Sequence, residues 1–202
     1  PFCHQACHYC DFHFSTRMAG KEAMVTAIQK EIALQKNYLA GDALETIYFG
    51  GGTPSLLHSD ELAAILRTIR SHFTVDENAE ITLEANPEDL TQDYLQAIQD
   101  LGINRLSIGI QSFQDRNLKF LNRNHGADQS IQAIRDAQEI GLTNISIDLI
   151  YGLPENSLAD LEQDILQAVQ TGVNHISAYS LTVEPKTVFG HQKKQGTFRE
   201  VS

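Results

Sequence analysis

The sequence predicts an α/β fold built around a parallel β-sheet. Runs of β-branched residues alternate with segments whose apolar residues recur at helical spacing along most of the 202 residues. The alternation repeats at intervals of roughly 30 residues, which is the usual length of a βαβ unit. A repeat of this kind is compatible with an open doubly wound sheet or with a barrel, complete or partial.

Five strands are expected because β-branched and aromatic residues are concentrated in five short segments. These segments are Leu44–Phe49, Glu80–Glu84, Asn104–Gly109, Asn144–Ile150 and Asn174–Leu181. Five helices are expected around them, namely Lys21–Leu39, Ser59–Ser71, Thr91–Leu101, Ala127–Ile140 and Ser157–Gln170. Ser59 and Thr91 are candidate N-caps, and the glycines at positions 102, 141 and 172 are expected to end three of the helices.

Polar residues, glycine and proline follow the expected strands. Ligands gather at the carboxyl ends of the strands in doubly wound sheets and in barrels, so these strand ends are expected to share one site. Glycine and proline could merely end the strands. That explanation fits Glu84, Gln111 and Asp148 less well, since a charge at a buried strand end is costly without a partner. The strand-end segments are Gly50–Pro54, Glu84–Pro87, Gly109–Ser112, Asp148–Pro154 and Ser180–Pro185.

Composition and charge exclude several classes of protein. Hydrophobic residues make up 42% and charged residues 20%, as in ordinary soluble domains, and no stretch reaches the roughly 18 apolar residues of a membrane span. A net charge of −11 argues against nucleic acid as the partner. All three cysteines lie within the first ten residues, which indicates a local metal site in a reducing cytoplasm rather than a disulfide framework.

The cysteine spacing Cys3-x3-Cys7-x2-Cys10 is suited to three corners of an iron–sulfur cube. With no fourth cysteine, one iron would stay open to a small molecule that carries an amine and a carboxylate. The alternative is structural zinc, because nearby histidines could complete a Cys₃His set. Zinc is disfavoured because it would explain neither the glycine turn nor the strand-end carboxylates. The histidines, at positions 4, 8 and 13, are expected to be loop and surface residues.

The glycine turn Gly50–Pro54 would let the backbone approach a ligand closely. It matches neither a P-loop nor a dinucleotide-binding fingerprint. Further along the chain, Arg123 is expected either to pair with a carboxylate or to form a surface salt bridge. His125 is expected to be structural or exposed rather than a ligand.

Six ordered motifs resemble one known group of proteins. Pro1–Phe14 (PFCHQACHYCDFHF) resembles the cluster loop of the radical-SAM superfamily. The other five resemble the oxygen-independent coproporphyrinogen III oxidase-like group within it. They are Gly50–Ser55 (GGGTPS), Leu83–Pro87 (LEANP), Leu106–Phe113 (LSIGIQSF), Ile147–Pro154 (IDLIYGLP) and Leu181–Pro185 (LTVEP). The resemblance implies a partial (β/α)₆ TIM-like barrel truncated at both ends. Residues 1–202 would then be the core domain of a longer protein whose C-terminal domain is missing.

The resemblance also implies roles for individual residues. Cys3, Cys7 and Cys10 would ligate a [4Fe–4S] cluster, and Tyr9 would lie beside the adenine of S-adenosylmethionine. Glu84 would face that cofactor or, as in the oxidase, a second copy of it. The remaining cofactor-binding positions are Gly51, Gly52 and Thr53 for the methionyl part, together with Gln111, Arg123, Asp148 and Thr182.

One position separates two branches of the group. The oxidase branch carries a further cysteine two residues after the third, where this chain has Phe12. The resemblance is therefore greatest to the HemW-type haem chaperones. It implies haem and haem-accepting proteins as partners, an electron donor such as flavodoxin or ferredoxin, and membrane contact only through partners. The haem site would lie outside these residues. The alternative is an oxidase that decarboxylates porphyrin propionates.

Overall fold

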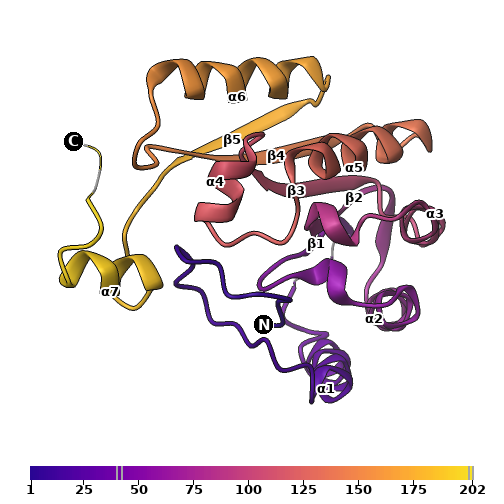
Figure 1. The fold of residues 1–202 in the computed structure, drawn as a ribbon. Helices are drawn as coiled ribbons and strands as arrows, with labels where there is room; N and C mark the ends of the chain where they lie inside the picture. Colours follow the sequence, from indigo (N-terminus) through magenta and orange to yellow (C-terminus); the bar gives the residue numbers. More distant parts are fainter. Residues whose placement is uncertain (40, 42, 200, 202) are drawn as a thin grey trace.

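The computed structural model describes all residues except 40, 42, 200 and 202. Within them, five strands form one parallel sheet in the order β1-β2-β3-β4-β5. They are β1 (Leu44–Phe49), β2 (Val75–Ala85), β3 (Arg105–Gln111), β4 (Ile145–Tyr151) and β5 (His175–Ser180). The sheet curls into an open half-barrel (Figure 1). The strand order follows the chain without the reversal of a doubly wound sheet, so the partial barrel is confirmed.

Helices cover the outer face of the curve, whereas the N-terminal segment lies across its inner side near α4 and α7 (Figure 1). The helices are α1 (Lys21–Leu34), α2 (Ser59–His72), α3 (Gln92–Asp100), α4 (Asp115–Phe120), α5 (Ala127–Glu139), α6 (Leu158–Gln170) and α7 (Val188–Lys194). Two single turns of 3₁₀-helix, η1 (Pro54–Leu56) and η2 (Pro87–Asp89), follow β1 and β2. No helix of the described chain is long and apolar enough to cross a membrane.

Several expected boundaries were wrong. Helix α1 ends at Leu34, five residues before the predicted end; Leu34 and Tyr38 are both 81% exposed, so no packing supports a longer helix. The N-cap of α2 is His58 rather than Ser59, and its N–H donates to the Glu61 carboxylate at 2.8 Å. Strand β2 begins at Val75, which pairs with Leu44, although the three residues after Val75 are polar and exposed. The short helices α4 and α7 carry too few turns for a periodic signal.

Alternation along the strands creates a dry face and a polar face. In β3, Leu106 and Ile108 are fully buried in the core beneath the helices. The residues that alternate with them, Ser107 and Gly109, line a cavity on the concave side. The same alternation in β4 directs Ile147 to the core and Asp148 to the cavity, while β2 buries Leu83 and presents Glu84. The polar strand positions therefore meet on the inner face.

A buried carboxylate holds the chain where β3 ends. Asp164 of α6 is 4% exposed and accepts hydrogen bonds from the Ser112 hydroxyl at 2.7 Å and the Phe113 N–H at 2.9 Å. The Ser112 oxygen in turn accepts from the side chain of Asn117 at 3.0 Å. These bonds hold the chain after Gln111, whose φ of +71° lies in the left-handed region that non-glycine residues rarely occupy.

We expect Asp164→Ala to lower the free energy of unfolding by about 2–4 kcal/mol, because a buried donor and a partly buried donor lose their acceptor. Chemical denaturation measures this loss. Glu162→Ala in the same helix is the control, because Glu162 is exposed and its removal should be nearly neutral. An Asp164→Ala protein as stable as this control would contradict the account.

Candidate functional site

A cavity of about 670 Å³ lies at the carboxyl ends of the strands on the concave side. All twelve residues expected to bind the cluster or cofactor line it. They are Cys3, Cys7, Tyr9, Cys10, Gly51, Gly52, Thr53, Glu84, Gln111, Arg123, Asp148 and Thr182. The structure thus brings together every predicted site residue, although up to 179 residues separate them in the chain.

The loop that carries the cysteines is docked on the glycine turn after β1. The Thr53 N–H donates to the Phe2 carbonyl oxygen at 2.8 Å. A Cβ atom on Gly52 would lie only 2.7 Å from the same oxygen, so only glycine allows this approach. Beyond the cysteines, the loop closes on itself, because the Ser15 N–H donates to the Pro1 carbonyl at 2.6 Å. The glycine turn therefore fixes the position of the loop.

The three cysteines are free and partly exposed at the cavity. Two of their sulfur atoms accept hydrogen bonds from distant parts of the chain. The Thr53 hydroxyl donates to Cys3 Sγ at 3.3 Å, and Arg123 Nη1 donates to Cys7 Sγ at 3.4 Å. Burial raises the pKa of the Cys10 thiol.

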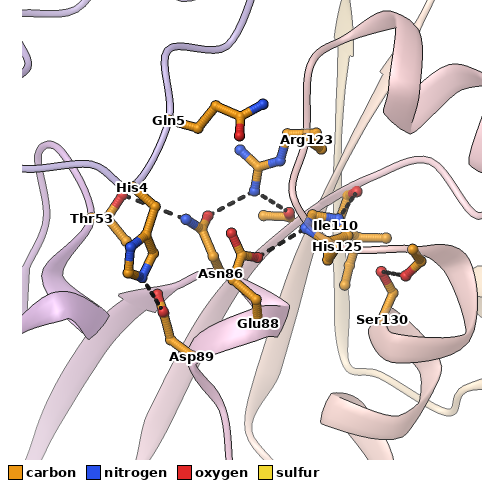
Figure 2. A network of polar contacts seen from close by, with 12 residues as sticks. His4, Gln5, Thr53, Asn86, Glu88, Asp89, Ile110, Arg123, His125 and Ser130 are labelled. Carbon is orange, nitrogen blue, oxygen red and sulfur yellow. Dashed lines mark hydrogen bonds and ion pairs between the residues drawn. The ribbon is translucent and has the colours of Figure 1, made fainter. Parts of the chain in front are cut away.

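Two histidines of the loop, His4 and His13, are exposed as expected, whereas His8 is half-buried and bonded to later parts of the chain. The His8 N–H donates to the Leu121 carbonyl, and the His8 carbonyl accepts from the Phe189 N–H, both at 3.1 Å. His8 Nδ1 lies 3.1 Å from the Phe120 carbonyl oxygen. The end of α4 and the helix α7, which were not predicted from the sequence, thus hold the loop at His8, between Cys7 and Cys10. His4 Nε2 pairs with an Asp89 oxygen at 2.8 Å (Figure 2).

Arg123 lies at the centre of a polar network (Figure 2). Its Nη2 donates to Asn86 Oδ1 at 2.7 Å and to the Gly109 carbonyl at 2.9 Å. Burial alone would lower the pKa of Arg123, but Tyr9 and Cys7 beside it raise that pKa above its usual value. Its Nε atom is buried and has no partner among the described residues. The interpretation of Arg123 as part of a surface salt bridge is therefore wrong.

His125 is buried beside this network and is structural. Its Nδ1 lies 3.0 Å from Glu88 Oε2, and its Nε2 lies 3.1 Å from the Ile110 carbonyl oxygen (Figure 2). Burial alone would raise the pKa of Glu88, but the hydrogen bond and charge of His125, together with Arg123, lower that pKa. The pair links η2 to β3 at the cavity wall, which Glu88 lines.

Two carboxylates from the strands reach the cavity. Glu84 is held by the Tyr48 hydroxyl at 2.8 Å and by the Gly51 N–H at 3.1 Å. Burial raises the pKa of Tyr48 to about 12, and the hydrogen bond to Glu84 adds to this. Burial also raises the pKa of Asp148, which the charge of Glu84 reinforces although the Ser177 hydrogen bond opposes it. The cavity therefore holds acidic groups on the strand side and a guanidinium near the sulfurs.

The remaining predicted residues complete the lining. Tyr9 lies between two cysteines, and burial raises its pKa. Gln111 is 8% exposed in its left-handed conformation, and a Cβ on Gly109 would lie 2.9 Å from its Nε2. Thr182 is exposed at the edge, where its hydroxyl donates to the Ser180 carbonyl at 3.4 Å.

Two residues that contribute to the site, Asn86 and Tyr48, were not predicted from the sequence. Asn86 bonds Arg123 and also lies inside the quoted LEANP motif, so the motif already contained it. Tyr48 precedes the glycine turn, but no local sequence pattern predicts its hydrogen bond to Glu84, which is 36 residues away in the chain.

The donor set fits an iron–sulfur cluster better than a single ion. Over the described part of the chain, no three His, Cys, Asp or Glu side chains are placed to hold one metal ion. A four-iron cluster does not need such convergence, because each of its thiolates binds a different iron. Three free thiols on one loop beside a cavity, two of them already accepting hydrogen bonds, suit such a cluster.

Comparison with known families agrees with this donor set. Residues 1–168 match the family described as the radical SAM superfamily. This chain belongs to the radical SAM superfamily. Two curated relatives are the haem chaperones HemW of Escherichia coli and of Mycobacterium tuberculosis, each 38% identical. The matches cover 94% and 97% of this radical SAM chain and 51% of each relative. The chain thus spans about half the length of these relatives.

Solved structures show the same fold. Coproporphyrinogen III oxidase (HemN) from Escherichia coli, a radical SAM enzyme, superimposes with a TM-score of 0.86 at 28% identity. That match covers 96% of this radical SAM chain and 45% of the oxidase. The archaeal Elp3 of Methanocaldococcus infernus shares the fold with a TM-score of 0.66 at 17% identity, over 87% of this chain and 46% of Elp3.

We expect Glu88→Gln to lower the free energy of unfolding by about 1 kcal/mol at pH 7, because a charge-assisted bond to His125 becomes a neutral one. The folded-state pKa of Glu88 is depressed, so its contribution is present above its unfolded pKa of about 4.3 and is lost as the pH falls through the folded value. Denaturation from pH 7 to 3 should show the two proteins converging below about pH 4. Glu162→Gln, at an exposed position, is the control, and a gap that stays constant with pH would contradict this assignment.

Proposed function

We propose that this chain is the S-adenosylmethionine-binding core of a HemW-type haem chaperone. The observation that carries the proposal is Phe12, two residues after Cys10. Its side chain is 79% exposed and lines the cavity, at the position where the oxidase branch has a further thiol. A phenyl group can neither ligate iron nor exchange a proton. The similarity to curated HemW proteins supports the same branch.

The cysteines, in this proposal, hold a [4Fe–4S] cluster through Cys3, Cys7 and Cys10, with the fourth iron left for S-adenosylmethionine. When bound, the cluster supplies the electron for reductive cleavage of that cofactor. The chain's own residues bind and orient. The unpartnered Nε of Arg123 is a donor suited to a carboxylate, since a buried donor left unsatisfied is costly.

The rest of the cavity is assigned to the other parts of S-adenosylmethionine. Gly51, Gly52 and Thr53 would receive the methionyl backbone, because their turn allows close approach. Glu84 and Asp148 would accept hydrogen bonds from ribose hydroxyls, as carboxylates do in other nucleotide sites. The last three positions, Tyr9, Gln111 and Thr182, would contact the adenosine.

Haem and haem-accepting proteins are the proposed partners, with a small electron-transfer protein as reductant in the cytoplasm. No described residue is assigned to haem. The second candidate function is the radical decarboxylation of porphyrin propionates. It is favoured by the 28% identity to the HemN structure and opposed by Phe12.

Anaerobic reconstitution with iron and sulfide tests the core of the proposal. We expect the broad visible absorption of a [4Fe–4S] cluster in the wild-type chain and its loss in Cys3→Ala, Cys7→Ala and Cys10→Ala variants. Zinc binding by the wild-type chain without this absorption would contradict the proposal. The choice between haem chaperone and oxidase is tested on the full-length protein. Haem transfer to an apo-haem protein without coproporphyrinogen turnover is expected, and turnover would favour the oxidase.

A further inference from the structure

We propose that Asn86 is a positioning residue that aims two hydrogen-bond donors at the cluster sulfurs and so raises the reduction potential of the bound cluster. This inference rests on the proposed function, because it assigns the cluster to Cys3 and Cys7. Asn86 follows β2 directly, at the carboxyl end of the strand, and its side chain lies between Thr53 and Arg123 (Figure 2).

One arm of the network leads to Cys3. Asn86 Nδ2 donates to Thr53 Oγ1 at 3.5 Å, and the same hydroxyl donates to Cys3 Sγ at 3.3 Å. A hydroxyl that accepts one hydrogen bond while donating another becomes a stronger donor. Thr53 has an exposed fraction of only 9%, so little water competes for its hydroxyl. The amide of Asn86 therefore directs this hydroxyl proton toward the sulfur.

The other arm leads to Cys7. Asn86 Oδ1 accepts from Arg123 Nη2 at 2.7 Å, and Nη1 of the same guanidinium donates to Cys7 Sγ at 3.4 Å. The guanidinium is planar and rigid, so fixing Nη2 also fixes where Nη1 points. The Gly109 carbonyl supplies a second acceptor for Nη2 at 2.9 Å. Among the residues that the structure describes, Asn86 is the side chain that hydrogen-bonds both sulfur donors.

Asn86 is itself held in place from the opposite side. Its backbone N–H donates to Ser55 Oγ at 3.2 Å, and the Ser55 hydroxyl donates to Asp89 Oδ2 at 2.6 Å. Pro87 follows it and begins η2. The backbone at Asn86 is thus fixed by the turn after β1 and by η2, which leaves its amide a constant orientation toward both arms.

Hydrogen bonds to cluster and ligand sulfurs are one of the levers that set the potential of an iron–sulfur cluster. Reduction adds negative charge, and donors on the thiolates stabilise that charge. Loss of Asn86 frees the Thr53 hydroxyl to turn away from Cys3 and leaves Arg123 Nη2 with the Gly109 carbonyl alone, so that both donors are less firmly aimed although no ligand is removed. The expected effect is a more negative midpoint potential with an intact cluster.

An electron-paramagnetic-resonance redox titration of the reconstituted chain, without S-adenosylmethionine, measures this potential. Asn86→Ala and the neutral, polar Asn86→Ser are compared with wild type. Asn78→Ala is the matched control, since Asn78 is exposed at the far end of the same strand. Iron content and thermal unfolding report cluster loading and folding for each protein, and Asn86→Ser decides the question if Asn86→Ala does not fold.

A midpoint potential below that of wild type in the Asn86 variants, with the Asn78 control unchanged, supports the inference. A Thr53→Val background should also reduce the further shift caused by Asn86→Ala, because one arm is already removed. Asn86 variants that hold a cluster at the wild-type potential would overturn the inference and leave the proposed function intact. A wild-type chain that takes up no cluster would overturn both.

Discussion

The close contact between the cysteine loop and the glycine turn is the constraint on which the rest of the site depends. The loop has no regular secondary structure of its own through which to fix its thiols. Its position comes from the Thr53 N–H bond to Phe2 and from the absence of a side chain at Gly52. Because the glycine turn directly follows β1, this contact fixes the position of the cysteine loop relative to the half-barrel. A rigid scaffold that positions a functional loop in this way is common in enzymes and binding proteins.

Glu84 and Arg123, which carry opposite charges at the cavity, bond to other partners and not to each other. Glu84 is satisfied by a hydroxyl and a backbone N–H rather than by a cation. Arg123 donates hydrogen bonds to an amide oxygen, a backbone carbonyl and a sulfur, and not to a carboxylate. Asp148 keeps a raised pKa because it is buried. A buried carboxylate with a raised pKa and a buried guanidinium N–H without a partner are typical of functional sites, because a ligand can supply the partners that they lack.

The sequence predicted what depends on local pattern. Alternation and strand ends were enough to place Glu84 and Asp148 on one inner face, since each strand directs every second residue the same way. Contacts between distant segments could not be predicted in this way. The bond of Asn86 to Arg123 spans 37 residues, and that of Asp164 to Ser112 spans 52. Nothing in either residue's neighbours along the chain specifies such a partner. The short helices α4 and α7 were not predicted for a different reason. Their stability comes from packing on the cysteine loop and not from a local sequence pattern.

The conformation of Gln111 shows that the site is a property of the whole half-barrel and not of its cysteine-bearing end. A left-handed conformation in a residue with a side chain costs of order 1–3 kcal/mol and persists only where the surroundings impose it. Here the constraint comes from Asp164, on the helix between β4 and β5, which holds the two residues that follow Gln111. The geometry beside the thiols therefore requires α6 to be packed against the end of β3. Folding of the loop and assembly of the cavity are coupled for this reason, and the cysteine loop alone, without the later strands and helices, could not reproduce the site.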